Sequence, residues 1–144
     1  MANTDTIKFL KECDMAVKMG VSSLDEVLDN VTHEKLKKIL INSKEQHQQI
    51  GEKLKVILSE YDKSGKEPNI MAKSMSWVKT NIHLLMDESD STVADLVTDG
   101  CNMGVKSLSK YINQYKDADK DVLDIARNLI NIEERLSVDL RPYL

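Results

Sequence analysis

Three polar residues interrupt the apolar rows of this chain and are the first candidates for chemistry. Asp14, His47 and Glu133 each occupy a heptad position whose neighbours in the row are mainly apolar. Two carboxylates and an imidazole can ligate a metal ion, or they can form a buried hydrogen-bonded cluster that fixes how helices pack. The residues therefore leave two interpretations open: a polar cluster without metal, and a metal site.

Long amphipathic helices are the elements that would position these side chains. Apolar residues recur at helical spacing over about 4–31, 32–61, 92–116 and 118–141. A shorter helical pattern, over about 70–86, follows the turn-forming residues 62–69. We therefore expect an all-α fold in a single domain, 1–144: a four-helix bundle of two hairpins, joined by a long crossover that carries an extra short helix.

The two halves of the chain share a weak internal similarity. Residues 13–18 (CDMAVK) resemble residues 101–106 (CNMGVK), and each segment lies in the first helix of its hairpin. This symmetry makes Asn102 the counterpart of Asp14. His47 and Glu133 are also counterparts, since each lies near the middle of the second helix of its hairpin, and we expect them to face each other in the bundle interior.

Small residues lie at a spacing of four on two of the expected helices. Gly100 and Gly104 share one face of the helix over 92–116, and Ala16 and Gly20 share a face of the first helix. Small side chains allow two helices to approach closely. We expect these two faces to meet.

Composition and charge exclude several classes of function. A net charge of −4 provides no basic face for nucleic acid. No apolar run approaches the roughly 18 residues of a membrane span, and residues 1–5 show no signal-peptide pattern. The two cysteines are far apart, which favours reduced thiols. We expect a cytoplasmic protein that binds neither nucleic acid nor membrane.

The segment 70–86 carries apolar residues on two adjoining faces. A helix that covers only its own core needs one such face. The second face indicates a homo-oligomer formed through 70–86. The two stripes are Met71, Met75, Val78, Ile82 and Leu85, and Ile70, Trp77 and Leu84.

Two helical hairpins joined by a long crossover resemble the ferritin-like superfamily. Metal-binding members of that family use one carboxylate from each of two helices and a Glu-x-x-His pair from each of the others. The resemblance places Asp14, His47 and Glu133 at ligand positions. Other ligand positions hold unsuitable residues: Lys44, Asn102 and Leu136. The resemblance thus implies a divergent member without the full di-iron ligand set.

The leading hypothesis is a non-enzymatic binding or structural protein of ferritin-like type, with no catalytic residues, no cofactor and no bound metal. The alternative is a di-metal oxidase or metal-storage protein that holds iron or manganese at Asp14, His47 and Glu133. A helical adaptor that shares only the number of helices is a third hypothesis.

Overall fold

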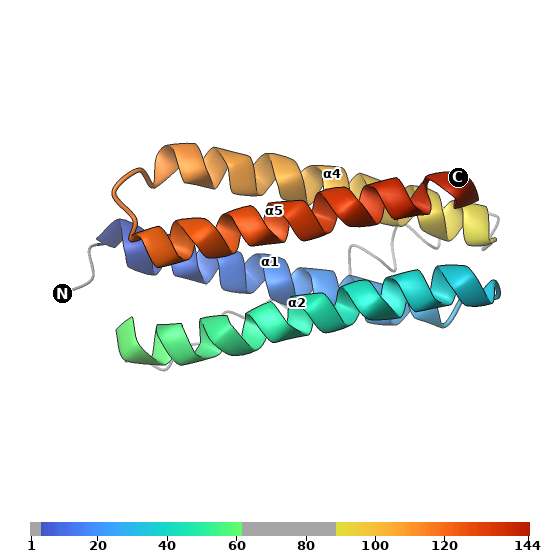
Figure 1. Cartoon of the computed structure of the whole chain (residues 1–144), viewed down its shortest axis with the longest axis horizontal. Coiled ribbons are helices and arrows are strands. Elements are labelled where there is room, and N and C mark those ends of the chain that lie inside the picture. The colour runs from blue at the N-terminus through green and yellow to red at the C-terminus, as the bar shows by residue number, and fades with distance from the viewer. Residues whose placement is uncertain (1–3, 62–88) are drawn as a thin grey trace.

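The computed structural model describes residues 4–61 and 89–144 as a bundle of long helices. The helices lie side by side along the length of the molecule (Figure 1). Their bounds are Thr4–Leu28 for α1, Glu34–Tyr61 for α2, Asp90–Gln114 for α4 and Lys120–Leu140 for α5, and a short 3-10 helix, Arg141–Tyr143, follows α5. This confirms the predicted all-α four-helix bundle.

The four helices form two antiparallel hairpins. Helices α1 and α2 make the first and α4 and α5 make the second (Figure 1). Helices α2 and α4 run in the same direction, because α2 ends at one end of the bundle and α4 begins at the other (Figure 1). The hairpins meet mainly through α2 and α5, whereas α1 and α4 share fewer contacts. The looser packing of α1 against α4 leaves space between them.

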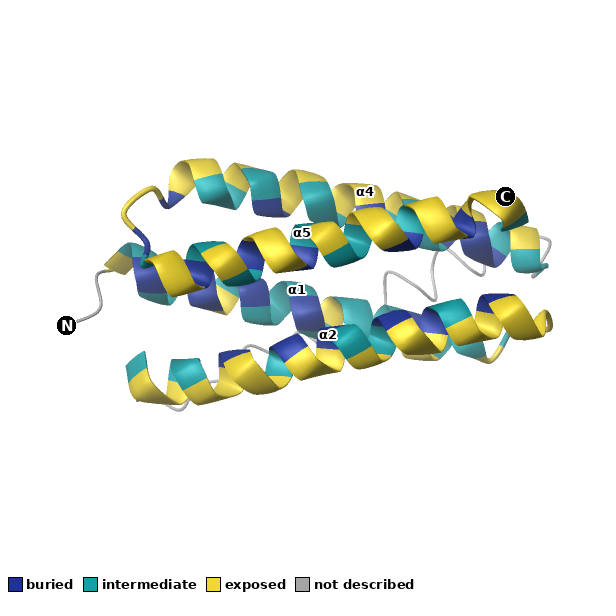
Figure 2. Cartoon of the chain, viewed as in Figure 1, coloured by how far each residue is buried: buried dark blue, intermediate teal, exposed yellow. Residues whose placement is uncertain are grey.

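Most of the predicted apolar rows form the core, but one row of α1 and part of the inward side of α4 are only half-buried. Buried residues face inward on all four helices (Figure 2), and the row through Leu10, Val17 and Leu24 is buried as expected. The row that contains Asp14, together with Ile7, Val21 and Leu28, is only half-buried. The buried stripe of α1 runs instead through Phe9 and Cys13, so Asp14 lies at the edge of the core.

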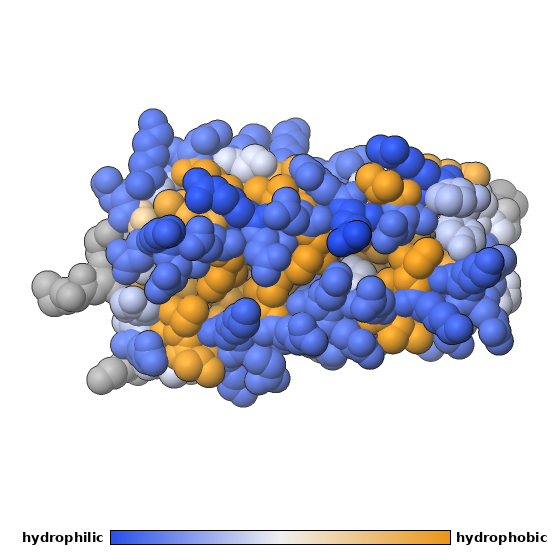
Figure 3. Space-filling view, viewed as in Figure 1, coloured by the Kyte–Doolittle hydropathy of each residue, from blue (hydrophilic) through white to orange (hydrophobic). Residues whose placement is uncertain are grey.

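Apolar atoms also reach the surface where the hairpins meet. On the face formed by α5 and α2, hydrophobic residues appear between the polar side chains of the two helices (Figure 3). Partly buried residues of both helices, among them Leu58 and Leu123, pack against the core. None of the described helices is both long enough and apolar enough to cross a membrane.

One prediction falls on residues outside 4–61 and 89–144: the short helix over 70–86, with the subunit interface assigned to it. His33, before α2, is exposed, and its ring contacts that of Tyr143 with centroids 5.2 Å apart.

Helix α4 begins earlier than the predicted residue 92, because Ser89 is its N-cap. The Ser89 hydroxyl accepts a hydrogen bond from the backbone N–H of Thr92 at 3.3 Å. Asp90 then joins the second hairpin to the turn of the first. Its carboxylate accepts hydrogen bonds from the N–H and hydroxyl of Thr32, both at 2.9 Å, and from the N–H of His33 at 3.0 Å. This carboxylate supplies acceptors for N–H groups at the start of α2.

Replacing Asp90 with alanine is expected to lower the free energy of unfolding at pH 7 by about 1 kcal/mol, since three hydrogen bonds are lost at a solvated site. The backbone N–H of Thr32 is the main cause that lowers the pKa of Asp90 below 3.8. The stabilisation is therefore present above pH 3.8 and is lost as the pH falls through the lower, folded-state pKa. Urea unfolding at pH 7 and pH 3 measures this, with Asp95→Ala, at an exposed position of the same helix, as the control. A difference from wild type that persists unchanged in acid would contradict the assignment.

Candidate functional site

A cavity of about 240 Å³ lies between α1 and α4. Its walls include the small residues that were expected to bring these helices together: Ala16, Gly20, Gly100 and Gly104. That expectation is wrong at Gly100, where an added Cβ would meet no atom within 4 Å. The bundle is held chiefly by its other helix pairs, so α4 does not advance to fill the space. The small faces shape a cavity instead of a close helix contact.

Gly20 does have a close neighbour, but that neighbour is a side chain of α2. A Cβ at Gly20 would lie 3.0 Å from Cδ2 and 3.2 Å from Nε2 of His47. These distances are shorter than ordinary van der Waals contacts. The missing side chain of Gly20 therefore makes room for the imidazole between α1 and α2.

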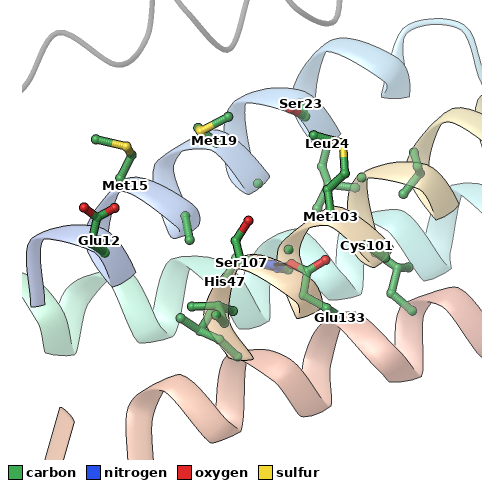
Figure 4. Close-up of a pocket in the computed structure, with 18 of the residues that line it drawn as sticks. Glu12, Met15, Met19, Ser23, Leu24, His47, Cys101, Met103, Ser107 and Glu133 are labelled. Atoms are coloured by element: carbon green, nitrogen blue, oxygen red, sulfur yellow. Dashed lines mark hydrogen bonds and ion pairs between the residues drawn. The ribbon is translucent and has the colours of Figure 1, made fainter. Parts of the chain in front are cut away.

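His47 and Glu133 face each other across the bundle, as expected from their rows and their symmetry. The two atoms His47 Nε2 and Glu133 Oε1 lie 2.5 Å apart, and the other ring nitrogen, Nδ1, lies 2.7 Å from the backbone carbonyl oxygen of Ser43. The side chain of His47 is 1% exposed and that of Glu133 is 15% exposed. Both line the cavity (Figure 4).

The partners of His47 favour its charged form. A carbonyl oxygen and a carboxylate can only accept hydrogen bonds, so an imidazolium that donates from both nitrogens satisfies both. Burial works to lower the pKa of His47, but the hydrogen bond to Glu133 and the charge of that carboxylate raise it above 6.5. The site is therefore a buried ion pair whose charges balance.

The two cysteines are free, buried and protonated. Burial is the main cause that raises the pKa of Cys13 to about 12, with smaller effects from Glu12 and Asp14. Burial also raises the pKa of Cys101, and the charge of Glu133 and a hydrogen bond to it raise that pKa further. Neither thiol has the depressed pKa of a reactive nucleophile. Cys101 instead adds a weakly polar group to the wall of the cavity, next to Glu133.

Three methionines form the rim of the cavity: Met15, Met19 and Met103. All three line it, and Met19 and Met103 are 38% and 54% exposed. Figure 4 shows Met15 and Met19 on successive turns of α1, with Glu12 beside them. Unbranched thioether side chains adapt to different shapes, which suits the entrance of a binding site. The sequence pattern carried this signal only weakly, because methionines also fill gaps in cores.

Asp14 is not brought to the pair. It forms an ion pair with Lys18, one turn away on α1, at 2.9 Å. Its predicted counterpart Asn102 is exposed. Among residues 4–61 and 89–144, no three His, Cys, Asp or Glu side chains form a group that could hold a metal ion. Of the three sequence candidates, the structure thus joins His47 and Glu133 and leaves Asp14 apart.

The described residues define an all-α four-helix bundle with an apolar cavity above a buried histidine–glutamate pair. Comparison of the chain with protein-family models, curated proteins and solved structures gave no match.

Proposed function

We propose that this protein is a non-enzymatic binding protein of ferritin-like type that takes a small apolar molecule into the cavity between α1 and α4. The cavity itself carries the proposal. Its volume of about 240 Å³ exceeds the roughly 150 Å³ of an engineered apolar cavity that binds benzene. The walls are mainly aliphatic, with Leu24, Leu96 and Leu108 among them. A preformed concave site of this kind is the usual place for a small ligand.

The ferritin-like part of the proposal is supported by the direction of the helices. Two antiparallel hairpins with α2 and α4 running in the same direction match the bundles that have one long crossover. The donor set favours binding over metal chemistry, because His47 and Glu133 already satisfy each other and Asp14 is paired with Lys18. Assembly into a homo-oligomer and a cytoplasmic location stay predictions.

Naphthalene is a suitable test ligand, since it is rigid, uncharged and compact. In spectra of protein labelled at its methionine methyl groups, naphthalene is expected to shift the signals of Met15, Met19 and Met103 in a saturable manner. Gly100→Leu should abolish this response. Its side chain would grow from a position with no atom within 4 Å of the new Cβ, and leucine favours the helix over glycine.

The matched control is Asn102→Leu, which adds a leucine to the exposed side of the same helix and outside the cavity wall. It should bind naphthalene as the wild type does. Absence of saturable binding to the wild-type protein would overturn the proposed function. Equal binding by Gly100→Leu would place the ligand elsewhere on the molecule.

A further inference from the structure

We infer that the cavity selects uncharged molecules that carry a hydrogen-bond donor, and that Oε2 of Glu133 receives this donor. The inference rests on the proposed binding function and adds the chemical class of the ligand. It follows from three features of the site: which oxygen of Glu133 is occupied, what covers the other one, and how the charges balance.

The two carboxylate oxygens of Glu133 have different surroundings. Oε1 is held by His47 Nε2 at 2.5 Å. Oε2 lies beside Gly104, 3.6 Å from the position that a Cβ would take there. Both Glu133 and Gly104 line the cavity. Glycine has no side chain that could cover Oε2, so a donor from a molecule inside the cavity can approach this oxygen beside the Cys101 thiol, which also bonds the carboxylate.

A hydrogen-bond donor on the ligand would also gain more from the groups around Glu133 than an apolar group would. Figure 4 shows the Glu133 carboxylate close to His47, with Cys101 and the exposed Ser107 on the neighbouring helix α4. A thiol is a weak donor, so Cys101 satisfies the carboxylate only in part. A hydrogen bond to an ionised acceptor is stronger than one between neutral groups. A hydroxyl or ring N–H of the ligand would therefore find its best acceptor at Oε2.

Charge balance excludes ionised ligands. The positive charge of His47 already offsets the negative charge of Glu133 in this buried pair. An ammonium group would add an uncompensated positive charge to an apolar space, next to the imidazolium. A carboxylate would be repelled by Glu133 and by Glu12 near the rim. The cavity thus fits molecules such as small indoles and phenols.

Two isomers test the inference: 3-methylindole and 1-methylindole. They have the same atoms and nearly the same size, but only 3-methylindole keeps the ring N–H. Titration of the methionine methyl signals is expected to give a Kd for 3-methylindole roughly tenfold or more below that for 1-methylindole. The ammonium compound indol-3-ylmethylamine is expected to bind more weakly than 3-methylindole.

The double variant His47→Leu/Glu133→Leu tests whether Glu133 accepts the hydrogen bond from the ligand. It removes both charges together and puts apolar side chains of similar size in their place. The variant is therefore expected to fold and to bind both isomers with nearly equal Kd. A preference for 3-methylindole that survives in this variant would show that another group, such as the Ser107 hydroxyl, receives the donor, and would overturn the inference.

The wild-type titrations separate failure of this inference from failure of the proposed function. Equal binding of both isomers, or tighter binding of the ammonium compound, overturns donor selection and leaves binding in the cavity intact. Lack of binding by naphthalene and by both isomers overturns the proposed function itself.

Discussion

Glu133→Leu is expected to destabilise the bundle by about 1–3 kcal/mol, although it adds an apolar side chain to an apolar cavity. The loss arises at His47, which is 1% exposed and keeps its Nε2 in the interior without a partner. Replacing both residues, as His47→Leu with Glu133→Leu, should cost much less than the sum of the single changes. The double variant removes the desolvation penalty of both charged groups together with their attraction.

Urea unfolding of the wild type, the two single variants and the double variant measures the coupling between His47 and Glu133. Additive losses would show that the two side chains do not stabilise each other. The pH provides a second readout, because the folded-state pKa of His47 lies above 6.5. The stabilisation from the pair is fully present below pH 6.5 and is lost as the pH rises through the folded-state pKa. This loss should be absent from the double variant, which retains both cysteines as an internal control for thiol ionisation.

Gly20→Ala and Gly100→Ala are expected to change stability in opposite directions, with a difference of about 2 kcal/mol. Alanine at position 100 meets no atom within 4 Å and should stabilise α4 by roughly 0.5–1 kcal/mol. Alanine at position 20 would press on His47 Cδ2 at 3.0 Å. The ring is held at both nitrogens, so moving it by a few tenths of an ångström strains these hydrogen bonds, and we expect overpacking to outweigh the gain in helix propensity.

Thermal and urea unfolding of the two alanine variants give the comparison directly, since each variant is the control for the other. If Gly20→Ala stabilised the protein as much as Gly100→Ala, the space around His47 would be larger than the structure shows. A loss that disappears when His47 is also replaced by leucine would confirm that the imidazole is the obstacle.

Heptad position was enough to predict the pairing of His47 with Glu133. A residue in the middle of an apolar row is expected to face the interior, and the symmetry of the two hairpins indicated which inward polar residues are counterparts. Asp14 was placed wrongly because its whole row, which also contains Ile7, Val21 and Leu28, lies at the edge of the core. The buried stripe follows Phe9 and Cys13, and Asp14 moves to the edge, where Lys18 can reach it.

The cavity could not be predicted, because its existence depends on distances between helices. Small residues at Gly100 and Gly104 are compatible with a close contact or with open space. Whether the contact or the open space forms depends on how α2 packs against α5 and how the helices pack within each hairpin. The residues of α4 alone do not reveal this packing. The same holds for the rim, because only the fold gathers Met15, Met19 and Met103 around one opening.

The link between His47 and Glu133 also bears on the order of events during folding. The contacts within each hairpin join residues that are near in sequence, and such contacts form early at low entropic cost. The pair joins residues 86 positions apart and belongs to the docking of one hairpin on the other. Docking in a wrong register would bury His47 and Glu133 away from each other at high cost. We therefore expect the pair to form late in folding and to slow unfolding of the assembled bundle more than it speeds folding.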